Sequence, residues 1–287
     1  MGSVEATHDT VGAVATKFAR DTAVTRVDDE VFHALVDEGW FVMRGPNGGY
    51  VAAIVLRALT ERVGDSARSP RSLTLHYVSP ADVGPVRITT SIERVGRSLT
   101  SCSARLHQGD RLVALAMAAF SSPRPGPVFC DLEMPKVPAA DQIEPMVVRP
   151  ESPAIAHRWD MRWAIGDEPW QEAPPAHEAV AGGWIRLEEP QVLDACAVAA
   201  VTDAWVPPVF SRMRQPFVVP TIDLTVHFRA SLPLPDATPD DSLLAVFRTD
   251  AANDGFLEES GEVWSKTGVL VAQSRQLAAV TQLVMPS

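Results

Sequence analysis

The sequence predicts an α+β protein made of two copies of one unit, each about half the chain. Residues 73–77 (LTLHY) recur as residues 224–228 (LTVHF), and an apolar helical stretch precedes each copy of this motif. Alternating stretches follow each motif and end in a Leu-Val-Ala run, at residues 112–114 and 270–272. A period this long is unsuited to a solenoid and indicates a duplicated domain.

The first copy is predicted to contain a buried helix and a set of strands. Residues 50–59 are apolar on nearly every side and follow the glycine-rich segment 45–49, which indicates a helix wrapped by other structure. Two short strands precede this helix, and four longer strands bounded by Gly, Pro or Asp follow it. We expect these strands at residues 22–31, 40–43, 71–78, 86–95, 99–108 and 111–121.

The second copy repeats this order. Residues 191–205 form its apolar helix, and residues 123–153, rich in proline and acids with little periodicity, indicate a linker laid over the surface. One long helix wrapped by an antiparallel sheet, twice in one chain, is the double hotdog arrangement. We therefore expect an N-terminal hotdog at residues 1–122, the linker, and a C-terminal hotdog at residues 154–287 that carries the candidate catalytic residues. Its strands are expected at residues 157–165, 183–187, 221–229, 243–250, 257–265 and 269–280.

Charge and cysteine content argue against several classes of function. The 287 residues carry a net charge of -11, whereas nucleic-acid binding needs a basic face. The three cysteines are far apart and lack metal-ligand spacing, so we expect no disulfide framework, metal site or cofactor. The N-terminus lacks a basic segment followed by an apolar core, and no apolar run reaches membrane-spanning length. We expect a cytoplasmic protein.

A carboxylate at the end of the second apolar helix is a candidate general base. Asp203 faces the negative end of the helix dipole, and this placement together with partial burial raises the pKa of a carboxylate. A general base benefits from both effects. The alternative is a side chain exposed to solvent at a frayed helix end. Asp194 lies in the first turn of the same helix, where an acid is stabilising, so a structural role is sufficient for it.

Two polar residues on the following strands are further candidates. Thr221 opens the strand at residues 221–229, whose alternation places it on one face with the polar and charged side chains of that strand. Gln276 shares a face with small and apolar residues, so its amide needs a partner there; the alternative is a core glutamine satisfied by backbone. Aligning the repeats pairs Thr221 with Pro70 and Gln276 with Ala118. The first copy therefore lacks both polar groups.

At these residues the chain resembles the acyl-CoA thioesterase II family. These double-hotdog enzymes hydrolyse fatty acyl-CoA thioesters with a water held by an aspartate, a threonine and a glutamine. The three family residues match Asp203, Thr221 and Gln276. After the Thr-Ile-Asp segment that begins at Thr221, the family usually carries histidine and serine, whereas this chain carries leucine and threonine.

The resemblance implies direct attack of water on the thioester, with the aspartate as general base and the threonine and glutamine holding the water. No Gly-x-Ser-x-Gly motif for a serine nucleophile is present. The family's glycine-rich helix entry resembles residues 47–50 (NGGY) here. The backbone amides of Gly48, Gly49 and Tyr50 are candidates for substrate binding as donors to the thioester oxyanion. The alternative is that these glycines merely shape a tight turn.

The expected activity is therefore hydrolysis of acyl-CoA to free acid and coenzyme A, and two alternatives remain. One is a hotdog enoyl-CoA hydratase, but its aspartate is followed five residues later by a histidine, where this chain has Pro208. The other is a non-catalytic acyl-binding protein of the same fold. Because free strand edges in hotdogs are commonly buried by pairing, we also expect a homo-oligomer, a dimer or larger.

Overall fold

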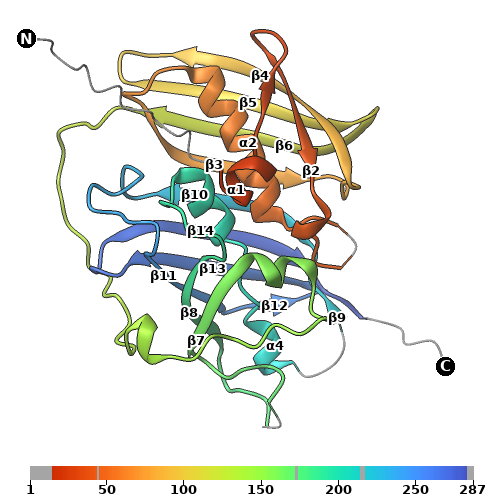
Figure 1. The fold of residues 1–287 in the computed structure, drawn as a ribbon, viewed down its shortest axis with the longest axis vertical. Helices are drawn as coiled ribbons and strands as arrows, with labels where there is room; N and C mark the ends of the chain where they lie inside the picture. The colour runs from red at the N-terminus through yellow and green to blue at the C-terminus, as the bar shows by residue number, and fades with distance from the viewer. Residues whose placement is uncertain (1–14, 44, 172–173, 214–216, 283–287) are drawn as a thin grey trace, which may run out of the picture.

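The computed structural model describes residues 15–43, 45–171, 174–213 and 217–282. Figure 1 shows the chain as two stacked halves, the first from red to yellow and the second from green to blue. The elements of the first half are α1 (Lys17–Asp21), β1 (Thr25–Arg26), β2 (Val31–Val36), the 3-10 helix η1 (Glu38–Trp40), α2 (Gly48–Val63), β3 (Ser69–Tyr77), β4 (Gly84–Val95), β5 (Leu99–Gln108) and β6 (Arg111–Ser121).

The second half follows a connecting segment with two 3-10 helices, η2 (Ala140–Gln142) and η3 (Ala154–Arg158). Its elements are β7 (Trp159–Ile165), β8 (Ala179–Leu187), α3 (Ala195–Val201), α4 (Val209–Arg212), β9 (Phe217–Val218), β10 (Thr221–Phe228), β11 (Leu243–Thr249), β12 (Ala252–Asn253), β13 (Phe256–Ser265), β14 (Leu270–Ala279) and β15 (Thr281–Gln282).

The strands of the two halves join into one antiparallel sheet. Across the described residues this sheet has 13 strands, in the order β1-β2-β4-β5-β6-β3-β10-β14-β13-β11-β8-β7, with β12 paired to β13; β9 and β15 form a separate pair. The long strands lie close to the predicted ranges, and β5 and β6 match them residue for residue. The α+β class and the double hotdog arrangement are therefore confirmed. The domain boundaries at residues 122 and 153 stay a prediction.

Helix α2 begins and ends at residues suited to its caps. The Asn47 side chain accepts a hydrogen bond from the backbone N–H of Tyr50 at 3.0 Å, which satisfies one of the free amides of the first turn. Gly64 ends the helix with φ 61°, a left-handed conformation that favours glycine. Between the caps, α2 is buried on most sides and packs against β3, β4, β5, β6 and α3.

Two predicted short strands in the first half are wrong in their details. The range 22–31 is interrupted because the Asp28 side chain accepts hydrogen bonds from the amides of Glu30 and Val31, both at 2.8 Å, and so forms a turn. The range 40–43 begins with η1 instead, because Asp37 accepts from the Gly39 amide at 2.9 Å. Capping by single side chains thus overrides the apolar pattern in both places.

Helix α3 is shorter than the predicted helix at residues 191–205. Asp194 caps its start by accepting from the Ala197 amide at 2.8 Å, so this aspartate has the structural role predicted for it. At the other end, the amides of Asp203 and Ala204 bond to carbonyls three residues earlier, which tightens the last turn. Asp203 therefore lies just beyond the helix.

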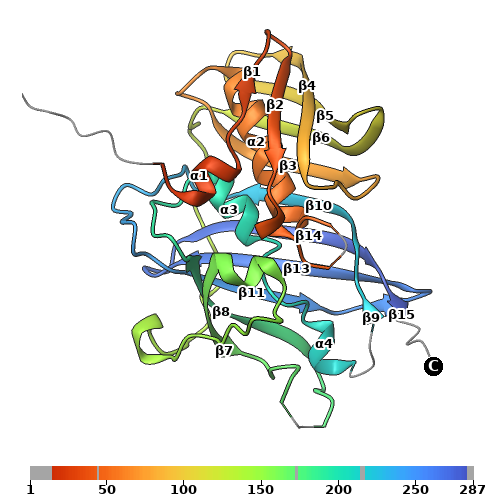
Figure 2. The same ribbon diagram turned by 45° about the vertical axis from the view of Figure 1, so that its right-hand side comes forward.

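The two copies of the repeated motif pair with each other. Strands β3 and β10 are antiparallel neighbours at the centre of the sheet, with Thr74 opposite Thr225 and their hydroxyl oxygens 3.0 Å apart. Leu73 lies opposite Val226 and Leu75 opposite Leu224, all fully buried. Figure 2 shows this seam between the halves. The repeat detected in the sequence thus forms the junction of the molecule.

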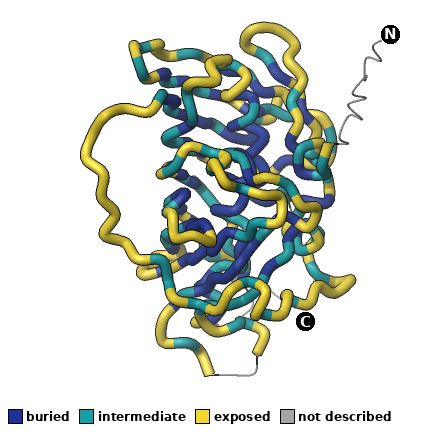
Figure 3. Tube along the Cα trace, turned by 60° about the vertical axis from the view of Figure 1, so that its left-hand side comes forward, coloured by how far each residue is buried: buried dark blue, intermediate teal, exposed yellow. Residues whose placement is uncertain are grey.

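The buried residues gather in the interior of the molecule, and the exposed residues lie at its periphery, as Figure 3 shows. A smaller apolar cluster lies under the connecting segment, where Met134, Val137 and Ile143 pack against Trp184 and Trp264. Most of that segment is exposed, as expected for a linker, but this part covers the second half. Among the described residues, no helix has both the length and the apolar character needed to cross a membrane.

Candidate active site

Asp203 lies against the N-terminus of α2. Its carboxylate Oδ2 accepts hydrogen bonds from the Gly49 amide at 2.9 Å and from Asn47 Nδ2 at 3.0 Å. Asn47 Nδ2 also donates to the Asp203 backbone carbonyl at 2.6 Å. The start of a helix carries a positive partial charge, so this position favours an anion. The first half of the chain therefore holds the aspartate of the second half.

The pKa of Asp203 is perturbed in the direction that suits a base. Burial raises the pKa from its ordinary 3.8 to about 6, although hydrogen bonds from Gly49, Gln276, Gly48 and Asn47 each lower it. A carboxyl with a pKa near 6 is ionised at neutral pH and still binds a proton readily. The alternative of a carboxylate exposed at a frayed helix end is wrong, because Asn47 and Gly49 at the start of α2 hold the side chain by hydrogen bonds.

Gln276 connects Asp203 to Thr221. It lies on the inward face of β14 with 8% of its surface exposed. Its Oε1 accepts from the Thr221 hydroxyl at 2.9 Å, its Nε2 donates to Glu259 Oε1 at 2.6 Å, and its side chain also lowers the pKa of Asp203. The prediction that this amide needs partners is confirmed, and these partners are side chains. The structure thus brings together the three polar residues singled out in the sequence.

A β-bulge at Ile222 turns Thr221 toward the site, which corrects the predicted face of this threonine. The strict alternation expected along β10 would place Thr221 on the same face as Asp223. Instead, the register shifts between these two residues, so that Thr221 lies opposite Ala278 and Asp223 opposite Leu277. Ala278 is buried on the face of Gln276. The extra residue in the bulge therefore turns the Thr221 side chain toward the interior of the sheet.

The first copy has the same framework without the polar groups. A register shift between Pro70 and Ser72 repeats the bulge, which puts Pro70 in the place of Thr221. Ala118 lies opposite Leu73 as Gln276 lies opposite Leu224. Cys102 lies opposite Ala118, in the position that Glu259 holds opposite Gln276. The geometry is therefore common to both copies, whereas the threonine, glutamine and glutamate occur in the second alone.

The glycine-rich entry of α2 contacts Asp203 closely. A Cβ added at Gly48 would lie 2.9 Å from Asp203 Oδ2, and one added at Gly49 would lie 2.5 Å from the Ala200 carbonyl oxygen. Both glycines therefore permit the end of α3 to approach α2. Tyr77 completes this side of the site, because its hydroxyl donates to the Gly48 carbonyl at 2.7 Å. Burial raises the pKa of Tyr77 well above its ordinary value, so its phenol stays protonated.

The three candidate amide donors have partners in this structure. That of Gly49 donates to Asp203 Oδ2, that of Tyr50 donates to Asn47 Oδ1, and that of Gly48 lowers the pKa of Asp203. The Tyr50 ring lies in the core, stacked on Trp40 with ring centroids 5.0 Å apart. A role of these amides in binding the thioester oxyanion would require a substrate to replace those bonds, and it stays a prediction.

Three residues of the site were not identified from the sequence. The sequence places Asn47 in the glycine-rich helix entry, and its position before two glycines is typical of an N-cap. Tyr77 aligns with Phe228 in the repeat, so its hydroxyl is another polar group found in one copy only. Glu259 follows Glu258, and the pattern of two adjacent acids does not indicate which of them faces inward.

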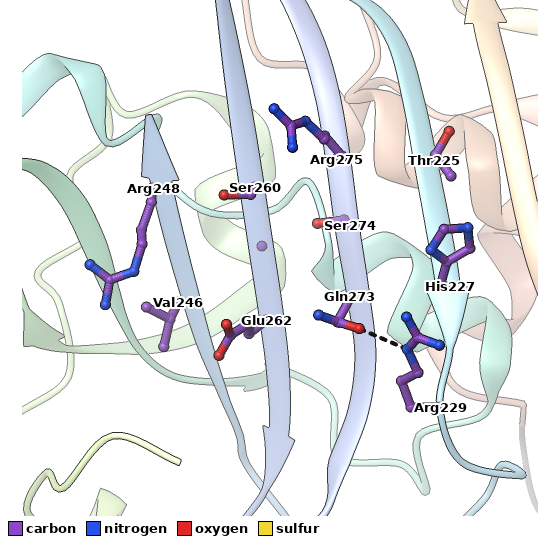
Figure 4. Close-up of a pocket in the computed structure, with 11 residues that line it drawn as sticks. Thr225, His227, Arg229, Val246, Arg248, Ser260, Glu262, Gln273, Ser274 and Arg275 are labelled. Atoms are coloured by element: carbon purple, nitrogen blue, oxygen red, sulfur yellow. Dashed lines mark hydrogen bonds between the residues drawn. The ribbon is translucent and has the colours of Figure 1, made fainter. Parts of the chain in front are cut away.

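A separate hollow lies on the opposite face of the second half. It has a volume of about 260 Å³ and is formed over β10, β11, β13 and β14, as Figure 4 shows. Arg275 and Gln273 line it and alternate along β14 with the inward-facing Gln276, so it is not part of the site around Asp203. Among the described residues, no group of three or more His, Cys, Asp and Glu side chains is placed to hold a metal ion.

Comparison with solved structures supports the fold. A conserved protein of unknown function with a hotdog fold from Alicyclobacillus acidocaldarius superposes with a TM-score of 0.86 at 29% identity, over 94% of this chain and 100% of that one. A putative thioesterase II from Thermobifida fusca gives a TM-score of 0.82 at 24% identity, over 93% of this chain and 98% of that one.

Comparison with sequences identifies the family. A thioesterase-like protein, TwmA of Talaromyces wortmannii, is 24% identical over 229 residues, and the match covers 68% of this chain and 64% of that protein. The model of the acyl-CoA thioesterase N-terminal domain matches residues 36–121, and that of the C-terminal domain matches residues 133–280. The chain therefore belongs to the acyl-CoA thioesterase family.

Proposed function

We propose that the protein hydrolyses acyl-CoA thioesters to free acid and coenzyme A, by attack of a water molecule that Asp203 activates. The observation that carries this proposal is the hydrogen-bonded set of Asp203, Gln276 and Thr221, which is present in one of two otherwise equivalent copies. Packing common to both copies explains the framework but not these polar groups. Family membership supports thioester chemistry for them.

The direction of the hydrogen bonds suggests how water would be held. Because Thr221 donates its hydroxyl proton to Gln276 Oε1, the lone pairs of its oxygen remain acceptors. The Asp203 carboxylate is also an acceptor. A water that donates one proton to each of these oxygens has a lone pair free for attack on the thioester carbonyl. Asp203 then takes the proton that the water loses, and the fixed orientation lowers the entropic cost of the step.

The two buried thiols, Cys102 and Cys196, support this route over a covalent one. Burial raises the pKa of Cys196, on α3, well above its ordinary value, and it raises the pKa of Cys102 to about 12. Both thiols therefore stay protonated at neutral pH, whereas a thiolate is the nucleophilic form of cysteine. Water activated by Asp203 is the simpler nucleophile.

A panel of acyl-CoA esters of graded chain length tests the proposal. Purified protein should release free thiol from at least one ester well above the uncatalysed rate. Binding without release across the panel would favour the non-catalytic acyl-binding alternative instead. Hydration of an enoyl-CoA without thiol release would favour the hydratase. Pro208 lies where the histidine of that enzyme would be, which disfavours this second outcome.

A further inference from the structure

Glu259 is a buried acid without a role in the mechanism outlined above. Only 6% of its surface is exposed, and its Oε1 lies 2.6 Å from Gln276 Nε2. Burial of a carboxyl group disfavours the folded state unless the group is paired or hydrogen-bonded. The equivalent place in the first copy holds Cys102, a small buried residue that fits the same framework. The fold itself therefore does not require an acid at this position.

The contacts of Gln276 show what this acid can do. Gln276 Nε2 donates to Glu259 and Oε1 accepts from Thr221, while the same side chain lowers the pKa of the Asp203 carboxyl group. A glutamine amide has two nearly isosteric orientations, and a flip would exchange its oxygen and nitrogen. In the flipped orientation Oε1 would face Glu259 Oε1, the oxygen that now accepts from Gln276, and Nε2 would face the Thr221 hydroxyl.

We propose that Glu259 is a positioning residue that fixes the orientation of the Gln276 amide, so that Oε1 faces Thr221 and an N–H faces Asp203. This inference rests on the proposed thioesterase function of the site. With the amide in this orientation, Thr221 must donate to it and keeps its lone pairs for water. In the other orientation Nε2 would donate to Thr221, whose hydroxyl proton would then point elsewhere. Glu259 thus acts on the attacking water through two intervening side chains.

Substitutions at Glu259 separate positioning from packing. Glu259→Leu removes the acceptor and should lower kcat by roughly 10- to 100-fold with KM little changed, because the amide is no longer held for the attacking water. Glu259→Gln keeps an oxygen acceptor in the same place and should restore most of the turnover. Glu258→Gln is the matched control, because Glu258 is the preceding residue on β13 and pairs with Arg275 at 3.3 Å. It should leave kcat unchanged.

A double-mutant cycle tests whether Glu259 acts through Gln276. In a Gln276→Ala background, Glu259→Leu should cause little further loss of kcat, because the amide that it positions is absent. An equal loss in both backgrounds would overturn the proposal. So would unchanged turnover in Glu259→Leu, or a Glu259→Gln variant as impaired as the leucine variant.

A readout independent of turnover distinguishes this inference from the proposed function. In protein labelled with ¹⁵N-glutamine, the Gln276 side-chain signals are identified by their loss in Gln276→Ala. These signals should move in Glu259→Leu and stay in place in Glu258→Gln. If the wild-type protein released no thiol, the proposed function would fail while this test of orientation still applied. Unmoved Gln276 signals in Glu259→Leu would overturn the positioning role even in an active enzyme.

Discussion

At the scale of single residues, the carboxyl groups of Asp203 and Glu259 lie on either side of the Gln276 amide, and their environments raise their pKa values to different levels. Burial raises the pKa of Asp203 to about 6 and that of Glu259 to about 8, although Gln276 lowers the pKa of each. Near pH 7, Asp203 is then ionised and Glu259 is protonated, and because Glu259 Oε1 accepts from Gln276, the proton belongs to Oε2. One buried negative charge is present, and it resides on the residue proposed as the base.

The acid limb of the pH–rate profile tests this assignment. The pKa of Asp203 is about 6, so below that pH kcat/KM should fall in inverse proportion to the proton concentration. The reason is that the protonated carboxyl cannot accept a proton from water. Thiol release measured from pH 4.5 to 7.5 would show this limb. A profile that stays flat down to pH 4.5 would mean that Asp203 does not titrate in this range or does not act as the base.

Stability should depend on pH through Glu259. The pKa of Glu259 is raised from its ordinary 4.5 to about 8, so between these values the folded protein holds a proton that the unfolded chain has released. The stabilisation is thus full below pH 4.5 and is lost as pH rises toward 8, at about 1.4 kcal/mol for each unit of pKa difference. Glu259→Gln should therefore raise Tm at pH 9 relative to wild type more than at pH 5. An equal change at both pH values would contradict this account.

At the scale of elements, the site depends on the close approach of α2 and α3. This approach is possible because Gly49 lacks a Cβ, which would otherwise lie 2.5 Å from the Ala200 carbonyl oxygen. That oxygen belongs to the backbone and cannot move without moving the end of α3, which precedes Asp203. The turn that places the base is therefore set by the packing of two helices, one from each half.

Gly49→Ala should accordingly destabilise the protein by about 1–3 kcal/mol and lower turnover, since the helices must separate to admit the methyl group. Gly126→Ala is the control, because a Cβ there meets nothing within 4 Å. Denaturant unfolding and thiol release measure the two effects. Gly49→Ala with the stability and turnover of wild type would show that α2 and α3 accommodate the methyl group without separating.

Much of the element pattern could be predicted from the sequence, because the long strands alternate and are bounded by turn residues. The bulge at Ile222 could not, since one extra residue in a strand leaves no mark on composition and becomes visible only in the pairing with β14. The inward direction of the Glu259 side chain likewise depends on the register of β13 against β14. Thr221 and Gln276 can be identified because the repeat pairs them with Pro70 and Ala118, and Asp203 can be identified because it is a carboxylate at the end of an otherwise apolar helix.

At the scale of the whole molecule, neither half contains the complete site. The first half supplies Asn47, Gly49 and Tyr77, and the second supplies the proposed catalytic residues. The β3–β10 seam holds these groups together by pairing the two copies of the repeated motif. The duplicated framework is thus used asymmetrically, with one copy as the support of the other. The predicted homo-oligomer would be a further level of assembly, and sedimentation would test it.

Separate expression of the halves tests this dependence. Residues from 151 onward, expressed alone, should be insoluble or inactive, because β10 would lose its partner strand and an apolar face would be exposed. Coexpression with residues 1–150 should restore thiol release if the halves reassemble along the seam. A soluble and fully active second half on its own would show that the site is not composite.

The central claim is that Asp203 is the general base of a thioesterase, and turnover of Asp203→Asn tests it most directly. The amide keeps the shape of the side chain but cannot accept the proton from water, so turnover should fall on the order of 10²-fold or more with the fold intact. Asp194→Asn, at the other end of α3, is the control, because asparagine also caps helices and should leave turnover near normal. Near-normal turnover in purified, folded Asp203→Asn would contradict the account.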